Sequence, residues 1–139
     1  MANIKICAAD MWFSKCVREA ADWQCQRCSK QYSENTRGLE CAHYMTRGKW
    51  ATRHDPLNVA ALCTGCHFYI DSHPYEKIAW FEQYLGQKIC EIIREKSEDT
   101  KHGLKKLKKE ISSHYRKEYQ ELLKKRSLGA TGKLEFVPF

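Results

Sequence analysis

The sequence predicts a small α+β fold built around a four-cysteine zinc site, flanked by helices and followed by a long basic C-terminal helix. Two Cys-x-x-Cys pairs, Cys25/Cys28 and Cys63/Cys66, bracket a segment rich in turn residues. Apolar residues recur at helical spacing before the first pair and after the second. The last third of the chain places lysines and arginines between apolar residues at the same spacing.

The N-terminal part is expected to form one helix ahead of the first cysteine pair. We predict it over residues 10–22, with Asp10 as its cap. One face of this helix would pack on the domain through Trp12, Phe13, Cys16, Val17 and Ala20.

A turn-rich hairpin is expected between the two cysteine pairs. Residues 34–57 contain Gly38, Gly48 and Pro56, which favour turns. Residues 58–70 carry the second pair and are expected to enter a helix.

Two more helices are predicted after the second pair. Pro74 suits the first turn of a helix that Gly86 can end, with an apolar face of Ile78, Phe81 and Leu85. Ile89, Ile92 and Ile93 indicate another short helix. The polar stretch 97–103 indicates a boundary, so we divide the chain into a unit of residues 1–94 and a unit of residues 95–139.

The C-terminal unit is predicted to form a basic amphipathic helix and a flexible tail. Its apolar stripe consists of Leu104, Leu107, Ile111, Tyr115 and Leu122. Three interpretations stay open: the helix tracks a DNA backbone, forms a homodimer through its stripe, or packs as an ordinary surface helix. For the first, the candidate phosphate contacts are Lys105, Lys108 and Lys109.

Composition restricts the class of protein. The 139-residue chain has a formal net charge of +7, which favours nucleic acid or another anionic partner. No apolar run is long enough to span a membrane, and the N-terminus lacks a signal-peptide pattern, so we expect a cytoplasmic protein. In that reducing compartment, eight cysteines favour metal binding over disulfides.

The two cysteine pairs are the strongest motif. Each pair can place two sulfurs on one tetrahedral ion, and two pairs close the site, which is typical of structural Zn²⁺. The alternatives are four unrelated buried cysteines or a thioredoxin-like redox motif, and the doubled pair disfavours both. Cys7, Cys16 and Cys90 lack paired spacing and are interpreted as packing residues. Cys41 could compete as a fifth thiol, but it is interpreted as a buried small residue because four ligands already close the site.

The order of residues around these pairs resembles a known family. A Cys-x-x-Cys pair is followed by His43, by Asn58 and by Cys63-x-x-Cys66-His67. This order is similar to that of the HNH endonucleases with their ββα-metal fold, and closest to the phage NinG (Rap) recombination nucleases. The segments that carry the resemblance are FSKCVREAADWQCQRC and CAHYMTRGKWATRHDPLNVAALCTGCH, and the similarity covers about residues 12–85.

The resemblance implies a role for each matching residue. His43 would be the general base that activates water, Asn58 would tie the loop between hairpin and helix, and His67 would bind a catalytic Mg²⁺ or Mn²⁺ ion. These types suit the chemistry, because imidazole accepts a proton near neutral pH and a divalent ion stabilises a departing phosphate oxygen. The four paired cysteines would hold the structural zinc.

One position departs from the family pattern. Most members have an aspartate that binds the catalytic metal just before the first histidine, whereas this chain has Ala42. A replacement ligand must come from elsewhere. Asp71 is the first choice, because residues four apart share a helix face, and Glu40 and His54 follow.

Each of these residues also has a simpler interpretation. His43 can be a buried structural histidine or an accessory zinc ligand, and His67 can belong to the zinc site. Asn58 can cap a helix. His54 and His73 are most simply surface histidines.

A basic stretch follows His43 and includes one aromatic residue. Arg47, Lys49, Trp50 and Arg53 would hold phosphates near the base, with Arg47 as the best candidate. Their alternative is a solvated loop.

Two functions therefore remain open on the sequence. The first is a metal-dependent endonuclease that hydrolyses DNA, with branched substrates such as junctions, D-loops or flaps implied by the resemblance alone. The second is a zinc-stabilised DNA-binding or assembly module without catalysis, which Ala42 and the extra basic helix favour. The ordered set of His43, Asn58 and His67 separates them, because a binding module has no need of all three.

Overall fold

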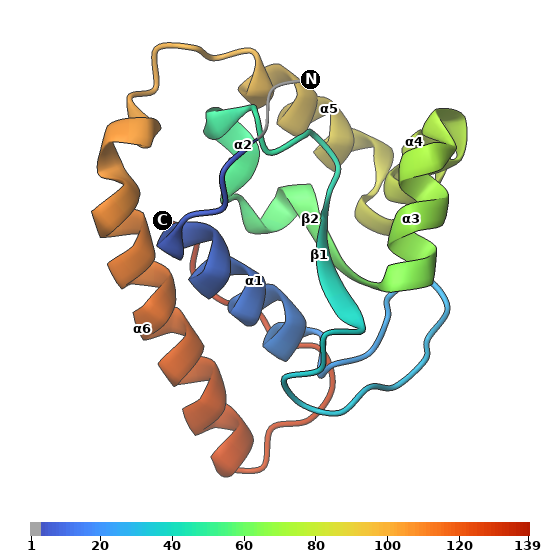
Figure 1. Cartoon of the computed structure of the whole chain (residues 1–139), viewed down its shortest axis with the longest axis vertical. Coiled ribbons are helices and arrows are strands. Elements are labelled where there is room, and N and C mark those ends of the chain that lie inside the picture. The colour runs from blue at the N-terminus through green and yellow to red at the C-terminus, as the bar shows by residue number, and fades with distance from the viewer. Residues whose placement is uncertain (1–3) are drawn as a thin grey trace.

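The computed structural model describes residues 4–139, which fold into a mixed arrangement of helices around one small sheet (Figure 1). The sheet is antiparallel and two-stranded. In chain order the elements are α1 (Ala8–Ala20), β1 (Leu39–His43), α2 (Trp50–Arg53), β2 (Val59–Cys63), α3 (Thr64–Ser72), α4 (Pro74–Leu85), α5 (Gln87–Ser97) and α6 (Lys108–Ser127). Short 3-10 turns cover Pro56–Asn58 and Leu104–Leu107. Within the described range, the helices are too short or too polar to cross a bilayer.

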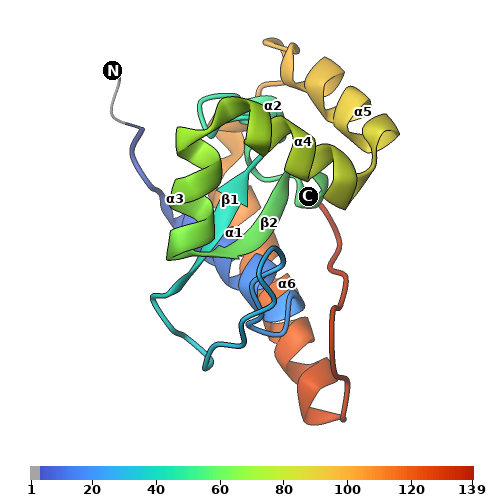
Figure 2. The same cartoon turned by 90° about the vertical axis from the view of Figure 1, so that its right-hand side faces the viewer.

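The sheet differs from the expected hairpin over residues 34–57. β1 pairs with β2, from Leu39 opposite Cys63 to His43 opposite Val59, so the second strand lies beyond the predicted range. The connection between the strands contains α2 instead of a tight turn. Every residue of β2 is buried, and α3 follows the strand directly (Figure 2). The strand therefore fixes both where α3 begins and how it is oriented.

The first helix begins two residues earlier than predicted and has a different cap. Cys7 is the N-cap, and Asp10 is the third residue of the helix. The Asp10 carboxylate accepts a 2.8 Å hydrogen bond from the Cys7 backbone N–H, as in a capping box. The expected face is buried at Phe13, Cys16 and Val17, along with Ala20, while Trp12 is half-buried.

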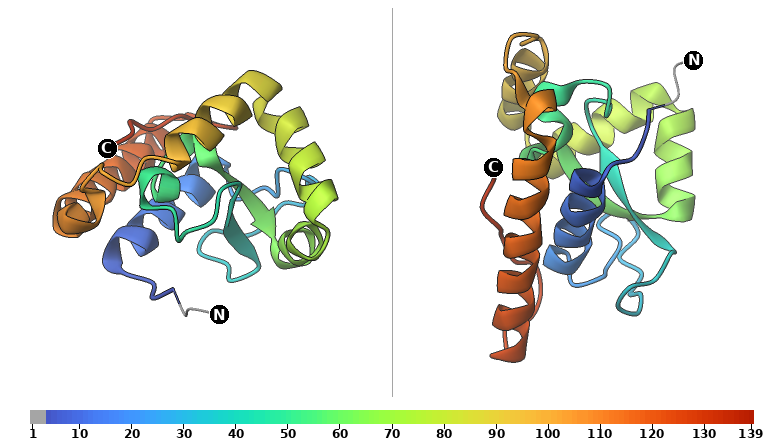
Figure 3. Two further views of the ribbon diagram at one scale, coloured as in Figure 1. Left: turned by 90° about the horizontal axis from the view of Figure 1, so that it is seen from above. Right: turned by 60° about the vertical axis from the view of Figure 1, so that its left-hand side comes forward.

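Helix α6 runs beside α1, as the right-hand view of Figure 3 shows. Ile111, Tyr115 and Leu122 of the predicted stripe are buried in the same hydrophobic cluster as Phe13. The apolar stripe thus packs against the rest of the chain, which favours the interpretation as a surface helix over a homodimer held by this stripe. Residues 95–139 consequently share their core with the preceding unit, and α5 passes through the boundary expected at residue 94.

The C-terminal segment was expected to be a flexible tail, but it packs against α1 and α6. The Leu134 N–H donates a 2.8 Å hydrogen bond to the Ala20 carbonyl, and the Val137 N–H donates a 2.7 Å bond to Glu118. Phe136 lies edge-on to Phe13, with ring centroids 6.1 Å apart. The physical reason is that Leu134 and Phe136, two residues apart on an extended segment, point to the same side and meet the core.

The other two predicted helices are present. α4 begins at Pro74 and ends at Leu85, and its C-cap Gly86 has a φ of 91°, which lies in the region that glycine adopts without steric cost. α5 buries Cys90 and Ile93.

Candidate metal centre and catalytic cleft

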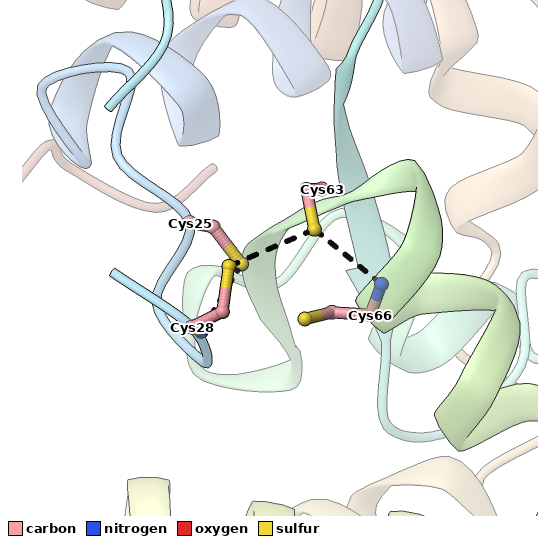
Figure 4. Close-up of side chains that lie close together, drawn as sticks. All are labelled: Cys25, Cys28, Cys63 and Cys66. Carbon is pink, nitrogen blue, oxygen red and sulfur yellow. Dashed lines mark hydrogen bonds between the residues drawn. The ribbon is translucent and has the colours of Figure 1, made fainter. Parts of the chain in front are cut away.

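Four sulfurs converge at one end of the sheet, as the cysteine pairs predict (Figure 4). The Sγ atoms of Cys25, Cys28, Cys63 and Cys66 all lie within 4.8 Å of one another. Tetrahedral Zn²⁺ with Zn–S bonds of ~2.3 Å places its sulfurs about 3.8 Å apart. Cys28 Sγ and Cys63 Sγ are 3.8 Å apart, so this cluster could hold a structural metal such as zinc.

Secondary structure positions both halves of the cluster. Cys25 and Cys28 lie in the loop after α1, and the Gln26 N–H in that loop donates to the Ala61 carbonyl of β2. Cys63 ends β2 and is the N-cap of α3, where its sulfur accepts from the Cys66 N–H at 3.4 Å. The pairing of the loop with β2 holds the two halves together.

The local electrostatics favour one thiolate before any metal binds. Burial by itself raises the pKa of Cys63, but hydrogen bonds from the Cys66 backbone N–H and from neighbouring side chains lower the pKa to about 7. Burial raises the pKa of Cys66 to about 12. Thiols packed this closely cannot all ionise without a cation, so metal binding must release protons.

The other four cysteines stand apart from this cluster. Cys16 and Cys90 are buried in the core, in agreement with a packing role. Cys41 lies on β1, and burial raises the pKa of its thiol to about 12. Cys7 lies beside Asp10 and His54, but its sulfur donates to the Asp10 carboxylate at 3.3 Å.

His43 lies at the end of β1 with its ring fixed from one side. Its Nε2 is 2.9 Å from the Arg53 carbonyl oxygen. A carbonyl oxygen only accepts, so Nε2 carries the hydrogen and Nδ1 of the neutral ring is an acceptor. Within residues 4–139, Nδ1 has no hydrogen-bond partner. Burial is the main cause that lowers the pKa of His43 to about 4; the hydrogen bond to the Arg53 carbonyl opposes this shift and the charge of Arg47 adds to it, so the ring is neutral at pH 7.

Asn58 connects three backbone groups of the segment between the strands. Its side chain is fully buried, and Oδ1 accepts from the Met45 N–H at 2.7 Å. Nδ2 donates to the carbonyls of Met45 and Thr52, each at 2.9 Å. These bonds hold Met45, two residues after His43, and Thr52, the residue before Arg53. The Arg53 carbonyl is the group that orients the His43 ring. Asn58 thus ties the loop, which is the arrangement that the resemblance implies for it.

His67 lies on α3 between two carboxylates. Nδ1 is 3.1 Å from Glu40 Oε1, and Nε2 is 3.1 Å from Asp71 Oδ2. The expected pairing with Asp71 four residues on is therefore present, although Asp71 also contacts Lys77 Nζ at 3.1 Å. The histidine lies outside the four-sulfur cluster, which disfavours its interpretation as a zinc-site ligand.

A cleft of about 410 Å³ brings these residues together. His43, His67 and Glu40 line it, whereas Asp71 lies outside its lining. Arg47 lines the same cleft, as the basic stretch predicts. Arg18 and Arg37 also line it, and sequence reasoning missed both. Only the turn-rich composition around Arg37 could have pointed to that residue.

Arg53 was predicted to contact nucleic acid, but its guanidinium forms an ion pair inside the protein. The side chain is 3% exposed, and its guanidinium contacts Asp10 through Nε at 2.9 Å and Nη2 at 2.6 Å. His54, expected at the surface or near His67, is also buried and donates to Asp10 at 2.8 Å. Although burial raises the pKa of Asp10, these partners hold it well below its usual range. A buried carboxylate requires such partners, so both side chains turn inward.

The remaining basic candidates lie at the surface. Lys49, Lys105 and Lys109 are exposed. Lys108 Nζ lies 5.7 Å from the ring centroid of Trp50, so the first residues of α2 and α6, far apart in sequence, are in contact. His73 is exposed and stacks on Tyr69 with centroids 4.2 Å apart.

No protein-family model matches the chain, and none of the curated proteins or solved structures is significantly similar to it.

Proposed function

We propose that this protein is a metal-dependent DNA endonuclease of the HNH type, with His43 as its general base. The observation that carries the proposal is the single acceptor nitrogen of His43, which lines a cleft together with His67, Glu40 and arginines. Here one nitrogen is anchored and the other is kept free to accept a proton.

The first step of the reaction is assigned to His43. Nδ1 takes a proton from a water molecule, and the resulting hydroxide oxygen forms a bond to phosphorus while the P–O3′ bond breaks. The Arg53 carbonyl keeps the proton on Nε2 and so keeps Nδ1 available. Asn58 acts as a positioning residue, because it fixes the loop that carries this carbonyl.

The donor atoms fit a divalent ion on the Glu40 side of His67. Two neighbouring ligands of an octahedral ion with ~2.1 Å bonds lie about 3.0 Å apart. Glu40 Oε1 and His67 Nδ1 are 3.1 Å apart and both residues line the cleft. Glu40 therefore replaces the missing aspartate at Ala42 better than Asp71 does. A bound Mg²⁺ or Mn²⁺ ion would supply positive charge to the phosphate and its leaving oxygen.

Asp71 is then assigned to orienting His67. A carboxylate on the second ring nitrogen fixes the tautomer and the direction of a metal-binding histidine. Its 3.1 Å contact with Nε2 suits this role.

Phosphate binding is assigned to the arginines of the cleft. Arg47 lines the cleft and its side chain has no hydrogen bond within the described residues, so it is available to a ligand. Arg37 is exposed at the same cleft. Guanidinium groups bind phosphate oxygens in pairs, which suits a scissile phosphodiester.

The second candidate is a zinc-stabilised DNA-binding or assembly module without catalysis. Ala42 and the exposed lysines near Trp50 and α6 favour it. This module would bind DNA without cutting it, whatever divalent ion is added.

The test is cleavage of linear duplex, flap and four-way junction DNA by the zinc-loaded protein, with and without Mg²⁺ or Mn²⁺. We expect cleavage that requires the added ion. The Glu40→Gln variant should need a higher ion concentration for half-maximal rate, and Asp71→Asn should shift it less. Binding of all three DNAs without any cleavage would favour the module and overturn the proposal.

A further inference from the structure

We propose that the buried arginine of α2, Arg53, positions both sides of the catalytic cleft at once: the general base His43 and the phosphate-binding Arg47. This inference deepens the proposed nuclease function and rests on it for the roles of those two residues.

The guanidinium of Arg53 is anchored by several hydrogen bonds inside the protein. It pairs with both carboxylate oxygens of Asp10, at 2.9 Å from Nε and 2.6 Å from Nη2. Nη2 also donates to the Lys5 carbonyl at 2.9 Å, and Nη1 donates to the Arg47 carbonyl at 3.3 Å. The residue is buried, and a two-pronged pair of this kind fixes the direction of the side chain as well as its distance.

The backbone of the same residue orients the general base. Arg53 is the last residue of α2, and the carbonyls at the end of a helix have no partner within that helix. Its carbonyl oxygen is therefore available to His43 Nε2, which lies 2.9 Å away. Arg53 thus holds Asp10 of α1 with its side chain and His43 of β1 with its carbonyl.

Helix α2 cannot keep this carbonyl in place by itself. The helix spans only Trp50–Arg53 and lies in the connection between β1 and β2 (Figure 1). Isolated helices shorter than ~12 residues are marginal in water, so the orientation of α2 must come from contacts outside it. Asn58 supplies one such contact at the Thr52 carbonyl, and Asp10 supplies another through the Arg53 guanidinium. Losing the second contact should let the Arg53 carbonyl move away from His43.

The Nη1 bond connects Arg53 to the phosphate side of the cleft. Arg47 lies in a turn after β1 and lines the cleft, and its carbonyl is the atom that Arg53 holds. A fixed backbone limits the positions that the Arg47 guanidinium can reach, which lowers the entropy lost when it binds a phosphate. Arg53 therefore acts on DNA affinity through Arg47 and on the chemical step through His43.

Lysine cannot replace Arg53 in this role. It keeps the positive charge that Asp10 requires, but an ammonium group has fewer donors and no planar fork. It cannot bond both Asp10 oxygens and the carbonyls of Lys5 and Arg47 together. Arg53→Lys should therefore keep the buried ion pair but release the turn that carries Arg47 and let α2 tilt.

The first test compares the wild type, Arg53→Lys, Arg47→Ala and the double variant. Kd of a linear duplex is measured by fluorescence anisotropy without added divalent ion, and the single-turnover cleavage rate is measured with Mg²⁺. We expect Arg53→Lys to raise Kd about threefold and to lower the rate about 10- to 100-fold. In the Arg47→Ala background it should leave Kd unchanged and still lower the rate. A residue with only a structural role would change Kd equally in both backgrounds.

Arg126→Lys is the matched control. Arg126 is another arginine that is anchored in the protein, since it donates to the Glu19 carbonyl at 2.7 Å and pairs with the Glu19 carboxylate at 3.5 Å. It lies outside the lining of the catalytic cleft. This variant should lose comparable contacts and keep the wild-type rate and Kd.

A second measurement observes the His43 hydrogen bond directly and needs no cleavage. The Nε2 proton of His43 should give a resolved signal in ¹H–¹⁵N spectra of the zinc-loaded wild type, and its loss in His43→Ala identifies it. In Arg53→Lys this proton should exchange with water about tenfold faster or more, whereas Arg126→Lys should keep the wild-type exchange rate. If Arg53→Lys does not fold, the wild type decides, because its His43 Nε2 and Arg53 Nε protons should exchange with the same opening free energy.

The outcomes separate this inference from the nuclease proposal. Additive effects of Arg53→Lys and Arg47→Ala on Kd, or unchanged exchange at His43 Nε2 in folded Arg53→Lys, would overturn the inference even if the protein cuts DNA. A wild-type His43 proton that exchanges while the Arg53 proton stays protected would also overturn it. Non-additive binding together with faster exchange would support the inference even if no DNA is cut, and in that case only the nuclease proposal fails.

Discussion

Replacing Asn58 with alanine should loosen the segment that positions His43. The side chain is fully buried and makes three hydrogen bonds of 2.7 to 2.9 Å. Each such bond contributes about 0.5–1.5 kcal/mol, so Asn58→Ala should lower the free energy of unfolding by about 3 kcal/mol. For a chain of this size, that corresponds to a melting temperature about 10 °C lower.

The assay is guanidinium unfolding at fixed free zinc, followed by cleavage at a temperature where the variant is folded. Thr46→Ala is the control, because Thr46 is exposed in the same loop. The cleavage rate of folded Asn58→Ala should fall while that of Thr46→Ala stays near wild type. A loss of stability below about 0.5 kcal/mol would refute the bonding argument. Wild-type cleavage by the folded variant would refute the positioning role.

Three further perturbations test other parts of the structure. Cys63→Ser should lose bound zinc and unfold at a lower temperature, whereas Cys90→Ser, outside the cluster, should keep one zinc per chain by elemental analysis. The pKa of His43 is lowered to about 4 in the folded state from ~6.5 in the unfolded state. As pH falls from 6.5 toward 4, the unfolded state therefore binds a proton at His43 that the folded state does not, and the free energy of unfolding decreases. The unfolding free energy of wild type should therefore fall more steeply over that range than that of His43→Ala; equal slopes would contradict the burial argument. Deleting residues 134–139 should lower the melting temperature by several degrees, because it uncovers Phe13 and Tyr115, and an unchanged melting temperature would mean that the segment adds no stability.

Much of the fold and the four-cysteine cluster could be predicted from short stretches of sequence. The doubled Cys-x-x-Cys spacing is a property of short segments, and the structure brings all four sulfurs together. The apolar spacing of α1 and α4 and the glycine after α4 likewise depend on near neighbours in the chain. Such features can be predicted because the same few residues both encode them and form them.

Contacts between distant segments could not be predicted in this way. Asp10 binds Arg53 and His54 across more than forty residues, so Arg53, predicted to contact phosphate, and His54, predicted to lie at the surface, both turn inward. The ring of His67 meets Glu40 of β1 only after the strands pair. The C-terminal segment was predicted to be flexible because the residues that Phe136 packs against lie on α1 and α6, outside the segment itself. In each case the partner is supplied by tertiary packing.

The central claim is that His43 is the general base of a nuclease. The most direct measurement compares wild type with His43→Ala in single-turnover cleavage of a four-way junction with Mg²⁺, alongside the Kd for the same DNA. The account predicts a rate about 10²- to 10⁴-fold lower in the variant, with unchanged Kd and zinc content. Cleavage by His43→Ala at the wild-type rate would contradict it, as would a wild type that binds the junction but never cuts it.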